Sequence, residues 1–278
     1  STGNMAVWRY HFIGSDAAGT EDLFNIAFWH ESVGQGGWYT VTQSHDSMTV
    51  RIGNDDVVKH RYYRNIKPMF TPDESAILYF VDTTGVFEPC LIPMAGAAPD
   101  TMQRRDLGGI FKTAGVGTAN RTVNEATVFE WKPGPAPHVL GFVAGGRIAL
   151  FDYAAEAVTV VEDLSEVGQI AWSPDGELMA AATGSGIYLV SPAGAVSSSP
   201  VYTLERSTDE IVGLAFSPSN TERKLGFSLV RKGKTAVDSW SALVIVDLST
   251  GFWTFASPRV PWTGAREPAV PYTWMRVM

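Results

Sequence analysis

The sequence predicts an all-β fold made of repeated four-stranded antiparallel sheets. An aromatic residue two positions before a proline turn, followed by an apolar strand, recurs four times, and the four prolines lie 61, 41 and 44 residues apart. Ser, Pro and Gly stand at turn positions that suit a type I turn. Steps of about 40 to 45 residues with several short strands are typical of propeller blades, so we expect a β-propeller. The four copies occupy residues 70–73, 131–134, 172–176 and 216–219.

The clearest repeat predicts four strands in chain order. Gly-Ser-Gly at 184–186 separates the second strand from the third at hairpin length, and Ser-Pro-Ala-Gly at 191–194 opens the connection to the fourth. The nearly continuous apolar runs indicate strands that are covered on both faces, as packed blades require. The four strands are expected at 170–172, 178–182, 187–190 and 201–204.

Neighbouring repeats follow the same order with variation. An upstream repeat lacks the proline but keeps the strand count, with Trp29 43 residues before Pro72. The repeat around Trp131 lacks the Asp that follows the proline in two other copies. The expected strands are 24–29, 38–42, 48–52 and 57–60; then 69–70, 76–81 and 90–92; then 128–131, 139–143, 148–151 and 158–161; and finally 214–216, 225–229, 243–246 and 252–255.

These repeats make five blades and leave one strand at each terminus, at 5–13 and 271–278. Unpaired strand edges invite aggregation, and pairing the two termini in one blade removes such edges. We therefore expect six blades, the last closed by the N- and C-terminal strands. The alternative is five blades with the termini paired outside the ring. In either case residues 1–278 are expected to form a single propeller domain with an inserted loop at about 101–124.

Composition excludes several classes of protein. Hydrophobic residues make up 45% of the 278 residues and charged residues 18%, which predicts a globular chain with a large core. A net charge of −8 argues against a nucleic-acid partner. No apolar run reaches the roughly 18 residues of a membrane span, and the first residues lack the features of a signal peptide, so we expect a soluble protein. The single cysteine, Cys90, lies in an apolar run and is expected to be buried.

Residues 170–176, Ile-Ala-Trp-Ser-Pro-Asp-Gly, followed by the apolar strand at 187–190, resemble the WD-like repeat of TolB-type β-propellers. The turns at 70–73 and 216–218 are similar to weaker copies of that repeat. The resemblance covers about residues 66 to 255. It implies a ring in which the repeat is a building unit and which usually serves as a protein-binding platform.

Departures from the repeat predict where a partner would bind. The insertion after Thr101 has no periodic structure of its own, and such loops are often binding elements. A tryptophan in the long hairpin between the strands of the last repeat would suit an interface hot spot. The candidate partner contacts are Arg104, Arg105, Phe111 and Trp240. The predicted function is a non-catalytic scaffold that mediates protein–protein interaction, as a subunit of or attachment module in a larger assembly.

The search for chemistry leaves no catalytic, cofactor-binding or metal-ligating residue to nominate, and no cofactor is expected. Gly184-Ser185-Gly186 is too short for a nucleophile elbow, and no two of the five histidines have a metal-binding spacing. The alternative is a lactonase-like small-molecule hydrolase with a metal in the central channel. Its ligands would come from different blades, and Asn25, Glu125 and Asp209 lie where they could reach such a channel.

Overall fold

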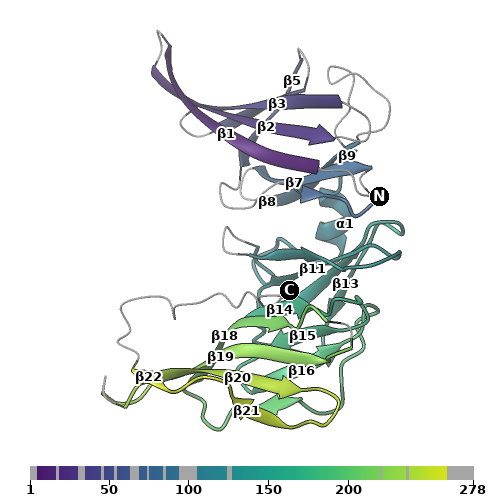
Figure 1. Cartoon of the computed structure of the whole chain (residues 1–278). Helices are drawn as coiled ribbons and strands as arrows, with labels where there is room; N and C mark the ends of the chain where they lie inside the picture. Colours follow the sequence, from purple (N-terminus) through teal and green to yellow (C-terminus); the bar gives the residue numbers. More distant parts are fainter. Residues whose placement is uncertain are drawn as a thin grey trace. The chain divides into compact units, whose positions relative to one another are not determined.

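The chain divides into two compact units, Ser1–Thr127 and Val128–Met278. The structure, a computed structural model, is shown in Figure 1. Almost all of its regular structure is antiparallel β-sheet. The described residues are 5–16, 19–30, 35–44, 47–52, 55–62, 69–73, 75–83, 86–93, 105–123, 127–219, 221–235 and 238–261.

The first unit begins with a meander in which each strand pairs with the next along the chain. β1 pairs with β2 from Met5 opposite His30 to Asp16 opposite Gly19. The remaining neighbours pair in the same antiparallel manner, so the four strands predicted upstream of Pro72 are present and in the predicted order. The strands are β1 (Met5–Asp16), β2 (Gly19–His30), β3 (Gln35–Ser44), β4 (Ser47–Ile52) and β5 (Asp55–Tyr62).

Four further strands of this unit continue the same sheet around the first proline turn: β6 (Met69–Phe70), β7 (Ala76–Thr83), β8 (Val86–Pro93) and β9 (Arg105–Asp106). β7 pairs with β5, so the nine strands form one sheet. The short helix α1 (Gly108–Thr113) follows β9, so the segment predicted as a loop contains a strand and a helix. Leu78 and Leu91 are buried in the core of this sheet. Cys90 is buried too, as predicted, and its thiol donates to Asp106 Oδ1 over 3.2 Å.

The second unit contains three sheets in chain order (Figure 1). Blade A comprises β10 (Phe129–Trp131), β11 (Val139–Ala144), β12 (Arg147–Asp152) and β13 (Ala157–Val161). Blade B comprises β14 (Gln169–Trp172), β15 (Met179–Ala182), β16 (Gly186–Val190) and β17 (Tyr202–Thr203). Blade C comprises β18 (Asp209–Phe216), β19 (Lys224–Arg231), β20 (Trp240–Asp247), β21 (Trp253–Phe255) and the short β22 (Val260–Pro261), which pairs with β20.

These sheets are the blades of a β-propeller, which confirms the predicted fold class. The first strand of blade B, β14, lies against the first strands of blades A and C, as neighbouring blades of a propeller require. The number of blades stays a prediction. Residues 271–278, the expected partner of the N-terminal strand, lie outside the described residues, and β1 is paired with β2 along its whole length.

The proline turns are fixed by side-chain hydrogen bonds that explain their sequence. In blade B, Ser173 Oγ donates to Asp175 Oδ1 over 2.6 Å and accepts from the backbone N–H of Leu178 over 3.0 Å. Thr71 makes the same pair of bonds, 2.6 and 3.0 Å long, in the turn of the first unit. Lys132 replaces the hydroxyl residue in blade A, where its ammonium donates to a carbonyl of the same turn. The repeated motif is therefore a structural corner.

Trp172 joins blade B to blade A. Its side chain is only 7% exposed, and its indole N–H donates to the backbone carbonyl of Glu130 over 3.1 Å. Gly141 makes this approach possible, because a Cβ there would overlap the Met179 methyl group and lie 3.2 Å from the indole nitrogen. The aromatic residue of the repeat thus fills the space between two blades.

We expect Trp172→Ala to lower the free energy of unfolding by about 3 to 5 kcal/mol, because it removes a buried aromatic ring and leaves a cavity. Urea unfolding of the wild type and the variant measures the difference. Phe252→Ala is a matched control, since Phe252 is 73% exposed, and should change stability by less than about 1 kcal/mol. An equally small loss for Trp172→Ala would show that Trp172 does not hold the blades together.

Candidate functional site

A polar groove of about 390 Å³ lies beside the packing of blade A against blade B. Its volume falls in the range of small-molecule sites, roughly 300 to 1,000 Å³. Two parts of the chain supply its walls: the loop between β13 and β14, and a stretch of blade B that comprises the β15–β16 hairpin, β16 and the chain after it. The lining residues are Asp163, Leu164, Ser165, Thr183, Ser185, Tyr188, Val196, Ser197 and Ser198.

Strand direction explains why these loops meet. In antiparallel sheets successive strands alternate in direction, so the β11–β12 turn, the β13–β14 loop and the β15–β16 hairpin all lie at the same end of their blades. A backbone hydrogen bond of 2.9 Å from Val167 N–H to the Gly146 carbonyl confirms that the first two are adjacent. A second, from Gly168 N–H to the Ala182 carbonyl, joins the β13–β14 loop to the strand that leads into the hairpin.

Arg147 anchors the part of the β13–β14 loop that carries Asp163. Its guanidinium donates to the backbone carbonyl of Glu162 and, over 2.9 Å, to that of Leu164, and it pairs with the Glu162 carboxylate at 3.4 Å. Leu164 and Val167 are buried in the core between the blades. The residues on both sides of Asp163 are therefore held, while its own side chain is exposed at the groove.

The β15–β16 hairpin is equally well fixed. Thr183 Oγ1 accepts from the backbone N–H of Ser185 over 3.2 Å and from that of Gly186 over 3.3 Å. Gly186 is required here, because a Cβ would overlap the Tyr202 carbonyl oxygen. The predicted hairpin turn at 184–186 is confirmed, and it presents the exposed Ser185 to the groove.

The groove offers unused hydrogen-bonding groups. Ser197 is engaged, since it accepts from the Leu189 N–H over 3.1 Å and donates to the Ser199 carbonyl over 2.9 Å. Among the described residues we find no protein partner for four other polar side chains of the lining, and no Lys or Arg lines the groove. Free donors and acceptors around a ligand-sized volume can bind a polar molecule. The four side chains are those of Asp163, Ser165, Tyr188 and Ser198.

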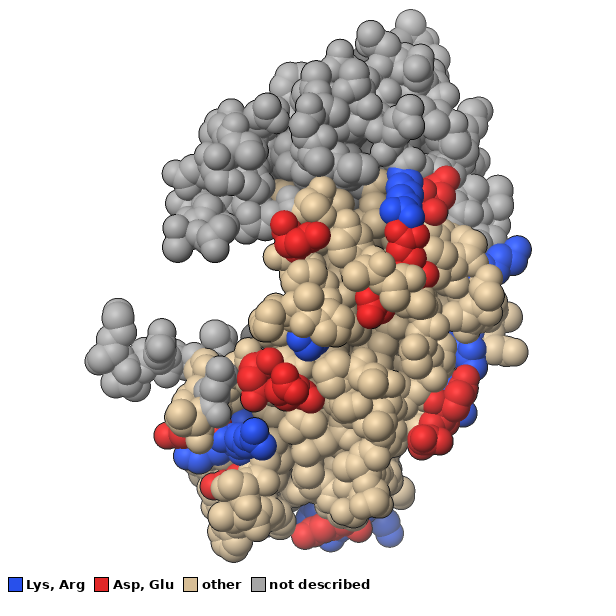
Figure 2. Space-filling model, turned by 90° about the vertical axis from the view of Figure 1, so that its right-hand side faces the viewer, with Lys and Arg blue, Asp and Glu red and all other residues tan. Residues whose placement is uncertain are grey.

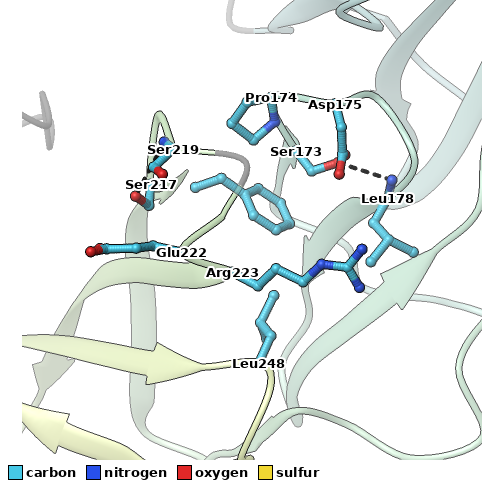
Figure 3. Close-up of a pocket in the computed structure, with 10 residues that line it drawn as sticks. Ser173, Pro174, Asp175, Leu178, Ser217, Ser219, Glu222, Arg223 and Leu248 are labelled. Atoms are coloured by element: carbon cyan, nitrogen blue, oxygen red, sulfur yellow. Dashed lines mark hydrogen bonds between the residues drawn. The ribbon is translucent and has the colours of Figure 1, made fainter.

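A second hollow, the corner pocket, lies between the proline turns of blades B and C (Figure 3). Its volume of about 20 Å³ has room for roughly one water molecule. Figure 3 shows Arg223 extending across the pocket, with its guanidinium toward Leu178. The hydroxyl of Ser173, backbone N–H groups and the charge of Arg223 lower the pKa of Asp175. The corner pocket is a packing feature of the turns and too small for a substrate.

The predicted contact residues have different environments. Arg104 lies outside the described residues, and Arg105 is exposed in β9. Phe111, in α1, is 0% exposed and leaves no surface for a partner in this conformation. Trp240, at the start of β20, is half-buried, and two guanidinium groups lie over its ring, that of Arg231 at 5.0 Å and that of Arg259 at 4.5 Å from a ring centroid.

The residues proposed for a channel metal do not form a metal site in the described part of the chain. Both carboxylate oxygens of Asp209 accept hydrogen bonds from Arg231, at 2.9 and 2.6 Å. Glu125 lies outside the described residues, and Asn25 lies in β2. Within the described ranges, no group of three or more His, Cys, Asp or Glu side chains is placed to hold a metal ion.

Two further features bear on partners. In the part of the chain that the structure describes, no helix has the length and apolar character needed to cross a membrane. On the face shown in Figure 2, the described Lys and Arg side chains form small separate patches, several of them beside Asp or Glu. The absence of a nucleic-acid partner stays a prediction.

No family model matches the sequence, and no curated protein is similar enough to it to indicate a relative. Similar solved structures include an oligogalacturonate lyase in complex with manganese, 12% identical, with a TM-score of 0.42 and coverage of 91% of this chain and 73% of that one. An oligogalacturonate lyase from Vibrio parahaemolyticus is 11% identical, with a TM-score of 0.41 and coverages of 94% and 75%. A dihydro-heme d1 dehydrogenase is 11% identical, with a TM-score of 0.39 and coverages of 84% and 52%.

The prediction of a non-catalytic scaffold is wrong by this comparison, because these similar structures are those of enzymes, a lyase and a dehydrogenase. The scaffold prediction relied on the absence of a linear catalytic motif. A groove built from separate parts of the chain has no such motif. At these identities and TM-scores, neither enzyme's activity is assigned to this chain.

We expect the Asp175 carboxylate to stabilise the fold near neutral pH and to lose that effect in acid. Because its pKa is lowered in the folded protein, the stabilisation is present above the pKa of an unfolded Asp, about 4, and disappears as pH falls through the folded value. Asp175→Asn should therefore have a lower melting temperature than the wild type at pH 7. The difference between the two melting temperatures should become smaller as the pH falls toward 3. Thermal melts across this range measure the effect.

The exposed Glu222, another carboxylate of the corner pocket, provides the control. Glu222→Gln should keep the pH dependence of the wild type. A constant difference in melting temperature between Asp175→Asn and wild type from pH 7 to pH 3 would contradict a role for the ionised carboxylate.

Proposed function

We propose that this β-propeller is an enzyme that binds a small polar molecule in the polar groove and acts on it there. The observation that carries the proposal is the Asp163 side chain, exposed at the groove on a loop that Arg147 holds in place. Fixed positions of polar groups favour catalysis, because a substrate bound to them has less freedom to lose on reaching the transition state.

The groove provides the groups that a polar substrate requires. The Asp163 carboxylate can accept a hydrogen bond from a substrate hydroxyl or orient a water molecule beside it. The hydroxyls of Ser165, Tyr188 and Ser198 can each donate and accept, and they have no protein partner among the described residues. The buried apolar side chains of Leu164 and of the core below give the groove a firm floor.

This proposal keeps the small-molecule substrate of the predicted hydrolase and changes the site. The predicted channel metal is not used, because the described residues offer no cluster of ligands for it. The groove needs only the protein's own carboxylate and hydroxyl groups. We also propose that the repeat is of the TolB type. The corner of blade B, in which Ser173 bonds both Asp175 and the N–H of Leu178, supports this assignment.

In addition to the catalytic function, we propose that the outer edge of blade C contacts a protein partner. This contact is supported by the side chain of Trp240, which lies 6.0 Å from the ring of Phe255. The ring of Phe255 in turn contacts that of Trp253, and both side chains are exposed. Aromatic side chains are enriched at protein interfaces.

Ligand binding tests the site. We would screen the wild type against polyols, sugars, nucleosides and amino acids by thermal shift, and measure the affinity of each hit by calorimetry. Asp163→Ala should weaken the affinity by about tenfold or more, because it removes a hydrogen bond to a charged group. Arg147→Met should weaken it less, since Arg147 only positions the loop.

Glu222→Gln, which removes an exposed carboxylate at the other end of the blades, should bind the hit as the wild type does. Equal affinity of the wild type and Asp163→Ala for every hit would show that the groove is not the binding site. Melting temperatures of all variants, measured without ligand, separate a loss of binding from a loss of folding.

A further inference from the structure

Glu166 carries a second carboxylate to the groove, although it is outside the lining itself. A Cβ built on Gly184 would lie 2.9 Å from Glu166 Oε2, so the carboxylate lies directly over the β15–β16 hairpin. Gly184 stands between Thr183 and Ser185, and both of these line the groove. The Glu166 carboxylate therefore lies beside these two lining residues, at the rim of the groove.

The backbone at Glu166 has an unusual conformation. Its φ is 57°, in the left-handed region, which side-chain-bearing residues other than Asn and Asp seldom adopt. Such strain persists only where the surroundings fix it and is common at functional sites. Here the neighbouring Val167 is buried, and its backbone N–H donates to the Gly146 carbonyl. The backbone of Glu166 also packs closely on Gly146, because a Cβ on Gly146 would lie 3.5 Å from the Glu166 nitrogen. The strained conformation directs the side chain over Gly184.

The charges around the groove are negative. Asp163 is in the lining and Glu166 is at the rim, and no basic side chain lines the groove. Arg147 anchors the loop, but its guanidinium is paired with Glu162 and donates to two carbonyls. An anionic ligand would be brought close to two carboxylates without a compensating cation among the lining residues, and like charges at such short range repel each other.

The lining also indicates what the groove accepts. Ser165, Ser198 and Tyr188 present hydroxyls that can donate and accept, and the Asp163 carboxylate accepts only. A molecule with many hydroxyl groups matches this set, because each of its hydroxyls can donate to a carboxylate and accept from a serine or tyrosine. A phosphate or a uronate offers charged oxygens that only accept.

We propose that the polar groove takes a neutral polyhydroxylated ligand of the sugar class and rejects its anionic counterpart, with Glu166 as the residue that sets this selectivity. The inference rests on the proposed function, since it concerns the same groove. Gly184 has a defined role in it, because the absent side chain leaves the space that the Glu166 carboxylate occupies.

Calorimetry at low salt with two matched probe sets tests the selectivity: neutral galactose oligomers, and galacturonate oligomers of the same length. The wild type should bind the neutral oligomer at least about tenfold more tightly. Glu166→Gln should reduce that ratio several-fold, mainly by improving binding of the galacturonate oligomer. Galacturonate bound as tightly as the neutral oligomer, or neither oligomer bound, would overturn the inference.

These outcomes are distinct from a failure of the proposed function. If the groove binds another molecule, Asp163→Ala still weakens the binding of that molecule by about tenfold or more, and only the proposed ligand class is wrong. If Asp163→Ala binds every ligand as tightly as the wild type does, the groove is not the binding site and the proposed function is wrong.

A pair of glycine variants tests the position of the Glu166 carboxylate. Gly184→Ala should displace the carboxylate and lower the ratio of neutral to anionic binding, as Glu166→Gln does. Gly168→Ala is the matched control, because nothing lies within 4 Å of a Cβ there and neither glycine has a positive φ. An unchanged binding ratio in Gly184→Ala, with melting temperatures equal in the two variants, would overturn the role of Glu166.

Discussion

The packing of blade B against blade A is the interaction on which the rest of the second unit depends. It requires a large ring, that of Trp172, to lie against a position without a side chain, Gly141. The indole hydrogen bond to Glu130 fixes the ring in the space between the blades. Burial in this space raises the pKa of the Glu130 carboxyl.

The polar groove follows from this packing. Where the apolar contact between the blades ends, Leu164 and Val167 continue it into the β13–β14 loop, and Arg147 holds that loop against β12. The side chains of Asp163 and Glu166 on this loop are exposed, Asp163 in the lining of the groove and Glu166 beside the hairpin of blade B. The rigidity of the candidate site is thus inherited from the core, although its groups are exposed.

Function was harder to infer than fold for a physical reason. The corner motif is the most regular feature of the chain, and its hydrogen bonds are used entirely within the turn, as Ser173 and Thr71 show. The residues of the groove have no regular spacing, because they come from the loop between β13 and β14 and from several parts of blade B. A search for linear catalytic motifs therefore favoured a non-catalytic scaffold, which the enzymes among the similar structures contradict.

The sequence by itself determined what depends on local hydrogen bonds and short-range periodicity: the strands, their antiparallel order, the proline corners, the hairpin at 184–186 and the buried position of Cys90. The sequence did not determine the structure of the inserted segment. In that segment Phe111, predicted to contact a partner, is buried in helix α1. Only the tertiary structure decided that Asp163, Glu166 and the hydroxyls of blade B lie at one groove. Their proximity depends on how blades A and B pack, and on which loops lie at the same end of the two blades.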